Sequence, residues 1–180
     1  TGFEPAEKNA SMLPSTAMTA QKIKWWRWLG VNDAEYGGLV GTHEGAMGSL
    51  RRIYRPTPNS KMRTAGQPFN HPSVESLIIE TYKHVHPIDD ASPAAGNWTG
   101  SNTFFVTPLR PMTHALSIQW YMNGVAVSGA TGEAFRPNNY KWNDGTYQLS
   151  VKVWDATPLV RDEDARTRYM TETKTWTVAV

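Results

Sequence analysis

The stretch SIQWYMNGVAVSG, residues 117–129, alternates apolar and polar side chains up to an Asn-Gly pair and continues with further β-formers after it. Period-two alternation is typical of a half-buried strand, and Asn-Gly between two such runs is the strongest short signal for a β-hairpin. Similar runs bounded by turn residues are TFFVT at 103–107, YQLSVKVW at 147–154 and TKTWTVAV at 173–180. The sequence therefore predicts a small β-sandwich from about Ser101 to Val180.

Trp120 and Tyr147 refine this prediction. Trp120 falls in the strand where an immunoglobulin-like sandwich places its core tryptophan. Tyr147 follows the turn residues 144–146, and this order is similar to the tyrosine corner, in which the phenol donates a hydrogen bond back to the backbone. We therefore expect an immunoglobulin-like or PKD-like sandwich.

The residues before this sandwich have the pattern of loops and short helices. TAQKIKWWRWLG, residues 19–30, contains helix formers and ends in a glycine, so it predicts a short helix. Apolar residues recur at helical spacing from the His71-Pro72-Ser73 step to about His86, which predicts a second helix.

Residues 87–100 concentrate Pro, Gly, Ala and Asp, a composition that indicates a linker. The expected fold class is thus α+β followed by all-β. We expect a first domain over residues 1–95 and the sandwich over residues 101–180.

Composition disfavours several classes of protein. Of the 180 residues, 39% are hydrophobic and 19% charged, which is ample material for a packed core. The formal net charge is +2 and the basic residues are scattered apart from Arg51 and Arg52, so nucleic-acid binding is not expected. Cysteine is absent, which rules out disulfides and thiolate zinc ligands. The longest apolar runs are far shorter than the roughly 20 residues of a membrane span.

The segment GTHEGAMGSLRRIYRPTPNSKMRTAGQPF, residues 41–69, carries the main functional signal. Together with the tryptophan-rich run before it and the helix and PID step after it, it resembles the bacterial IgA-peptidase family of zinc metallopeptidases, number sixty-four in the metallopeptidase series. In that family an HExxH helix carries zinc ligands and the general base, and no HExxH occurs in this sequence. The resemblance implies the C-terminal part of a zincin-like catalytic domain, with Thr1 as an internal boundary.

Four residues take candidate roles from this resemblance. Met62 is similar to the methionine turn beneath the metal of such peptidases, and the alternative is a methionine that fills a core. Glu44 is a candidate for the cleft wall or a substrate contact, against a solvated or salt-bridged carboxylate. Tyr54 and Arg55 are candidates to stabilise an oxyanion, against a structural role in a rigid, proline-containing connector.

The histidines are not expected to bind a metal. His43 begins an HE step, but the second histidine of a zincin helix, four positions later, is absent. His71, His84 and His86 lie around the second predicted helix and are expected to be ordinary surface side chains. His114 is expected to stand alone in the sandwich.

Trp25, Trp26 and Trp28 form a cluster that matches the family's tryptophan run. We expect these side chains to pack within the first domain. If the zinc helix is a separate piece, part of this aromatic surface is expected to be exposed.

The resemblance implies a secreted, extracellular zinc metalloendopeptidase, in which metal-activated water hydrolyses a peptide bond. This chain would supply the floor and one wall of the cleft, while its expected partners are a protein or peptide substrate and a missing N-terminal segment that bears HExxH. Alone, the chain is expected to be inactive. The alternative function is a non-catalytic extracellular binding or structural module.

Overall fold

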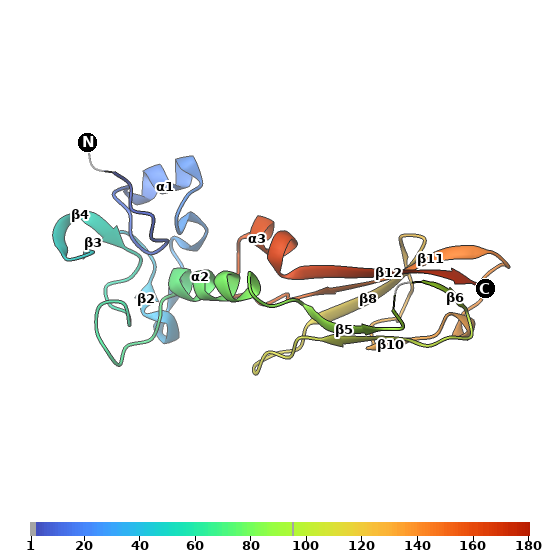
Figure 1. The fold of residues 1–180 in the computed structure, drawn as a ribbon. Helices are drawn as coiled ribbons and strands as arrows, with labels where there is room; N and C mark the ends of the chain where they lie inside the picture. The colour runs from blue at the N-terminus through green and yellow to red at the C-terminus, as the bar shows by residue number, and fades with distance from the viewer. Residues whose placement is uncertain (1–2, 95) are drawn as a thin grey trace. The chain divides into compact units, whose positions relative to one another are not determined.

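The computed structural model describes residues 3–94 and 96–180 and has a mixed α+β fold. The chain divides into two compact units (Figure 1). Unit 1 contains Thr1–Glu80 and Leu159–Asp162, and unit 2 contains Thr81–Pro158 and Glu163–Val180. The division expected between residues 95 and 101 therefore lies inside unit 2.

Unit 2 is built on two β-sheets, with strand orders β10-β7-β5 and β6-β12-β11-β8-β9. The strands are β5 Ile88–Ser92, β6 Asn97–Thr99, β7 Phe104–Pro108, β8 Ser117–Met122, β9 Val125–Ala126, β10 Ala134–Phe135, β11 Thr146–Trp154 and β12 Thr171–Ala179. Neighbouring strands run antiparallel, except that β6 and β12 are parallel. The expected strands at 103–107, 147–154 and 173–180 are confirmed as β7, β11 and β12, with small shifts of their ends.

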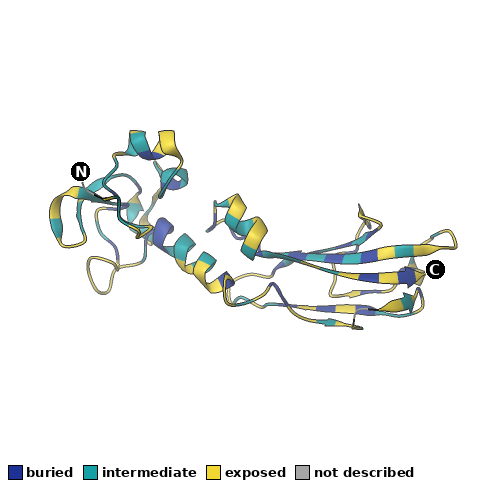
Figure 2. Cartoon of the chain, turned by 45° about the horizontal axis from the view of Figure 1, so that its top comes forward, coloured by how far each residue is buried: buried dark blue, intermediate teal, exposed yellow. Residues whose placement is uncertain are grey.

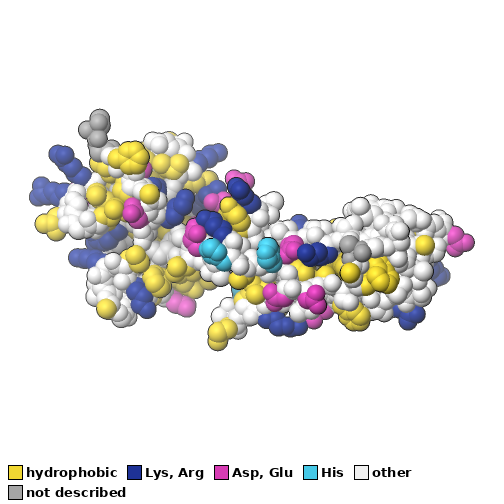
Figure 3. All heavy atoms as spheres, in the orientation of Figure 1, with side chains coloured by type: hydrophobic (Ala, Val, Ile, Leu, Met, Phe, Trp, Pro, Cys, Tyr) yellow, Lys and Arg dark blue, Asp and Glu magenta, His cyan; other side chains and the backbone are white. Residues whose placement is uncertain are grey.

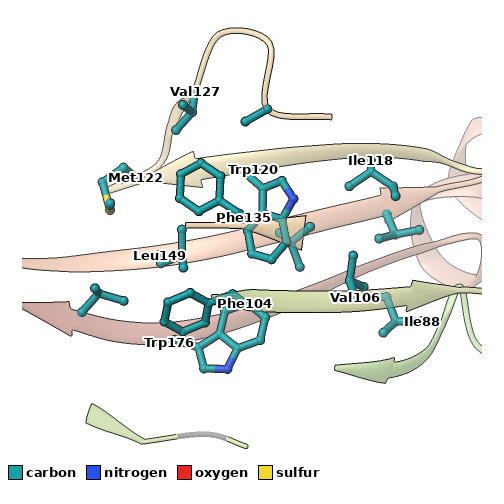
Figure 4. Packing of buried hydrophobic residues seen from close by; sticks show 14 of the residues in the cluster. Ile88, Phe104, Val106, Ile118, Trp120, Met122, Val127, Phe135, Leu149 and Trp176 are labelled. Atoms are coloured by element: carbon teal, nitrogen blue, oxygen red, sulfur yellow. The ribbon is translucent and has the colours of Figure 1, made fainter. Parts of the chain in front are cut away.

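The two sheets share one hydrophobic core (Figure 4). Trp120 of β8 is fully buried, and its ring lies 5.2 Å from Phe135 of the first sheet and 5.8 Å from Trp176 of the second. Along β8 and β11 buried residues alternate with more exposed ones, as Figure 2 shows for the long strands. The period-two pattern of the sequence thus identified the buried face of these two strands.

Two local predictions in unit 2 are confirmed. Asn123 and Gly124 have φ of 49° and 77° and join β8 to β9, with Met122 opposite Val125. Both turn residues have the positive φ that a tight two-residue hairpin turn requires. The hydroxyl of Tyr147 donates a hydrogen bond of 3.0 Å to the backbone carbonyl of Asn143, four residues earlier.

Residues 87–100 are not a linker, because β5 and β6 lie within them. β5 pairs with β7, and β6 pairs with β12, so each forms the edge of its sheet. Edge strands tolerate the Asp, Pro and Gly residues that make a segment resemble a loop. Composition alone therefore misassigned this stretch.

Unit 1 combines helical turns with two small hairpins. Its elements before the second helix are α1 Ser15–Gln21, η1 Trp26–Trp28, β1 Asn32–Asp33, η2 Ala34–Tyr36, β2 Gly38–Leu39, β3 His43–Ala46 and β4 Ser49–Arg55. The helix expected over residues 19–30 is wrong in its bounds, since Lys22 and Lys24 adopt φ of 53° and 57° and break it. Helix-forming side chains could not reveal these left-handed residues.

The second helix, α2, spans His71–Tyr82 and ends earlier than predicted. Its start is capped by Asn70, whose Oδ1 accepts a 3.0 Å hydrogen bond from the amide of Ser73. The sequence had suggested His71 or Ser73 as the cap. A further helix, α3 Glu163–Tyr169, and the short turn η3 Pro137–Asn139 were not predicted. None of the helices in the described ranges has the length and apolar character to cross a membrane.

The core of unit 1 is small and tryptophan-rich. It consists of Met18, Trp25, Trp28 and Val40. The indole nitrogen of Trp25 donates a 2.7 Å hydrogen bond to the carbonyl of Gly41, which satisfies its polar atom. The expectation of packing is confirmed for Trp25 and Trp28, each of which is about 1% accessible.

Candidate functional site

An open groove of about 740 Å³ lies in unit 1 and contains three of the four residues singled out from the sequence. Glu44, Arg55 and Met62 line it, together with Glu7, Asn9, Ala10, Gly45, Ala46, Met47, Gly48, Ser49, Leu50, Pro56, Ser60, Arg63 and Asn70. Tyr54 is not among the lining residues. The groove has the size of an ordinary ligand pocket.

The hairpin β3–β4 positions one side of the groove. Met47 and Gly48 form its two-residue turn with φ of 52° and 75°, and Ala46 pairs with Ser49. The ladder shifts register at Gly45, which has φ of 98° and leaves the regular pairing. A bulge of this kind re-aims neighbouring groups, and here it turns the backbone carbonyls of the hairpin toward Arg55.

Arg55 links the hairpin to the following proline-rich segment through hydrogen bonds. Its Nη1 donates to the carbonyls of Glu44 and Gly45, the latter at 2.6 Å. Its Nε and Nη2 donate to the carbonyl of Pro58 at 3.2 and 3.1 Å. Burial lowers the pKa of Arg55 from its ordinary value, and the nearby charge of Arg63 lowers it further. These four bonds favour the anchoring role that the sequence left open.

Glu44 also has a structural contact. Its carboxylate accepts a 2.8 Å hydrogen bond from the backbone amide of Arg52, a residue with a φ of 67°. The carboxylate therefore stabilises an unusual backbone conformation in β4. Its side chain remains exposed at the groove.

Met62 lies at the surface. It is 62% accessible, and the groove-lining Met47 and Leu50 are 57% and 90% accessible. In Figure 3 hydrophobic side chains stand among several basic ones at the end of unit 1 that carries β3 and β4. Met62 therefore does not fill a core within this chain, which removes the alternative considered for it.

Tyr54 belongs to the framework of unit 1. Its ring packs against the Trp25 and Trp28 core. Its backbone exchanges two hydrogen bonds with Ser11, at 2.7 and 3.1 Å, and so ties the N-terminal segment to β4. This placement favours the structural reading of Tyr54.

A stack of four side chains in unit 1 was not anticipated. His71 lies between Trp28 and Tyr36, with ring centroids 4.4 and 4.1 Å away, and Arg161 covers the Trp28 ring at 4.1 Å. Only 6% of His71 is accessible, so its expected surface position is wrong. Burial lowers the pKa of His71 from 6.5, although Asp33 at 3.5 Å acts in the opposite direction. The stack therefore favours a neutral imidazole.

Glu75 of α2 connects this stack to the segment Leu159–Asp162. One carboxylate oxygen accepts the indole N–H of Trp28 at 2.7 Å. The other accepts the backbone amides of Arg161 and Asp162 at 2.6 and 3.0 Å. Glu75 thus holds the late segment within unit 1, and nothing in the local sequence around it signals this role.

A second polar cluster surrounds Asp155 in unit 2. The carboxylate is buried and accepts hydrogen bonds from Tyr82 Oη at 2.8 Å and from the Thr157 amide at 2.7 Å. His114 Nε2 lies 2.8 Å from Asp155, so His114 does not stand alone as expected. Burial and the Asp155 carboxylate together raise the pKa of Tyr82. Asp155 therefore joins the end of α2 to the segment before β8.

Within the residues that the structure describes, no three His, Asp or Glu side chains converge as ion ligands. The groove is lined by two arginines, Arg55 and Arg63, which donate to backbone carbonyls beside it, and by exposed apolar side chains. Comparison of the chain with protein-family models and with curated proteins finds no match.

Proposed function

We propose that this chain is part of a secreted zinc metalloendopeptidase, in which unit 1 supplies one wall of the substrate cleft. The observation that supports this proposal is the placement of Glu44, Arg55 and Met62 around one groove. These residues come from a single segment that resembles the IgA-peptidase family, and they are separated by two prolines and a turn.

Each groove residue has a defined part in this proposal. Arg55 holds the hairpin carbonyls and the connector in place, and is therefore a positioning residue. Met62, with Met47 and Leu50, offers apolar surface to substrate side chains. Glu44 shapes the strand β4 through the Arg52 amide.

The residues described in this chain do not fit a zinc ion. The proposal therefore requires the ligands and the general base to come from a second segment that bears HExxH. No chemical step is assigned to this chain, which binds and orients the substrate.

Unit 2 is proposed as an immunoglobulin-like accessory domain. Support comes from the two-sheet strand order, the parallel pairing of β6 with β12, the buried Trp120 on β8, and the tyrosine corner at Tyr147. Sandwiches of this kind serve many functions, so unit 2 does not by itself favour a peptidase.

The test is to isolate the tagged chain from its source and to measure its mass, its bound polypeptides and its zinc content. We expect a second polypeptide with HExxH, stoichiometric zinc, and casein hydrolysis that a chelator abolishes. Met62→Lys in the same complex is expected to lower hydrolysis, whereas Lys141→Glu, an exposed residue of unit 2, is expected to leave it unchanged. A metal-free chain isolated alone and without activity would contradict the proposal.

The alternative, a non-catalytic binding module, is favoured by one observation. The tryptophan core of unit 1 is closed within this chain, with Trp25 and Trp28 almost fully buried. Unit 1 therefore builds a core without any further segment. Folding and ligand binding by the isolated chain, with no peptidase partner in the source, would support this alternative.

A further inference from the structure

Two guanidinium groups meet beside the groove. Arg63 Nη1 donates a 3.0 Å hydrogen bond to the carbonyl of Pro58, the same oxygen that accepts two bonds from Arg55. Each guanidinium therefore lies in the field of the other, which is why Arg63 lowers the pKa of Arg55. Like charges this close are stabilised when an anion binds between them.

No carboxylate neutralises these arginines within the described parts of the chain. The charged residues between Gly45 and Val74 are all basic, namely Arg51, Arg52, Arg55, Lys61 and Arg63. Glu44 and Glu7 also line the groove. The Glu44 carboxylate is directed to the Arg52 amide, and neither acid forms an ion pair with Arg55 or Arg63.

Apolar surface accompanies this positive charge. Met47, Leu50 and Met62 line the same groove and are more than half accessible. Two of these side chains are methionines, which adapt to differently shaped partners. Exposed apolar side chains of this size beside unpaired arginines are typical of a surface that binds another molecule.

We propose that the groove selects an extended peptide in which a carboxylate side chain stands next to a large apolar side chain. The carboxylate binds Arg63, the neighbouring positive charge of Arg55 strengthens that contact, and the apolar side chain packs on Met62 and Leu50. This inference rests on the proposed function, since it names the substrate class of the same groove. A peptide is favoured as the occupant because the groove combines charge complementarity with a volume of about 740 Å³, the size of a few side chains.

The experiment measures fluorescence anisotropy of three labelled hexapeptides with the purified chain. The first peptide has two glutamates around one leucine, the second has glutamines in place of the glutamates, and the third has serine in place of the leucine. We expect the first peptide to bind at least about tenfold more tightly than either of the others, in keeping with a charge-assisted contact.

Substitutions in the groove test whether it is responsible for this difference in peptide affinity. Arg63→Glu is expected to weaken binding of the acidic peptide roughly tenfold and to leave binding of the glutamine peptide unchanged. The Arg63 side chain is exposed, and within the described residues it donates a single hydrogen bond, to the Pro58 carbonyl. Lys141→Glu makes the same charge change in unit 2 and serves as the control. Met62→Ser is expected to weaken the binding of the two peptides that contain leucine.

The outcomes separate the two proposals. Equal binding of the acidic and glutamine peptides would overturn the acidic preference and leave the proposed cleft wall standing. Failure of all three peptides to bind would overturn both the acidic preference and the proposed cleft wall. Binding to anionic phosphatidylserine vesicles with no peptide binding would also overturn the inference, because the groove would then recognise a lipid surface.

Discussion

Glu75 offers the sharpest test of how unit 1 is held together. Replacement by alanine removes the acceptor for the buried indole N–H of Trp28 and for the amides of Arg161 and Asp162. Leaving the buried indole N–H of Trp28 without an acceptor costs about 1–3 kcal/mol of stability. The loss of each hydrogen bond from the partly exposed amides costs about 0.5–1.5 kcal/mol. We therefore expect Glu75→Ala to weaken the attachment of residues 159–162 by about 3 kcal/mol.

The assay is trypsin cleavage after Arg161, followed by mass spectrometry, together with hydrogen exchange of the Asp162 amide. A loss of about 3 kcal/mol corresponds to a roughly hundredfold increase in the open population, and cleavage should rise accordingly when opening is fast. Glu75→Gln keeps an acceptor and is expected to show a smaller increase. Ser76→Ala, which removes only a bond to Pro72 within the same helix, is the control. Equal cleavage of Glu75→Ala and Ser76→Ala would refute the reasoning.

Burial lowers the pKa of His71 in the folded chain, so the unfolded chain binds the proton more readily and unit 1 loses stability as pH falls through 6.5 and below. His71→Phe should reduce this loss of stability, measured by urea unfolding at pH 7.5 and at pH 5.5. An unchanged pH dependence in the variant would contradict the prediction. Asp155→Ala should destabilise unit 2 by about 3 kcal/mol or more, since Tyr82 and His114 lose a buried acceptor; a thermal midpoint equal to that of the wild-type chain would show otherwise. Tyr147→Phe removes the hydrogen bond to the carbonyl of residue 143 and should lower the free energy of unfolding in denaturant by about 1 kcal/mol. Tyr121→Phe is the control and should leave that free energy unchanged, because the Tyr121 hydroxyl takes no part in this hydrogen bond.

The elements of unit 2 that follow a local pattern were the ones predicted from the sequence. Asn123-Gly124 and the alternation around Trp120 are properties of neighbouring residues, so they were visible without the fold. β5 and β6 were missed because edge strands carry the composition of loops. The early end of α1 depends on the backbone of Lys22 and Lys24, which side-chain propensity does not specify.

The groove could be predicted only in part. Glu44, Arg55 and Met62 were singled out by resemblance, and the structure brings them to one groove. Tyr54 was separated from them by the strand geometry of β4, which turns it toward the tryptophan core. Arg63 was not singled out, because its contact with the Pro58 carbonyl depends on the path of the loop between them.

The sequence by itself determined strands β7, β8, β11 and β12, the Asn123-Gly124 turn and the hydrogen bond of Tyr147 to the backbone, because each depends on the order of residues within one short segment. Only the tertiary structure decided that His71 is buried against Trp28, that Glu75 holds residues 159–162, and that His114 meets a buried Asp155. These contacts join residues that are far apart along the chain. Folding excludes water from these polar contacts and thereby strengthens them, and the local order of side chains does not show which groups will be buried together.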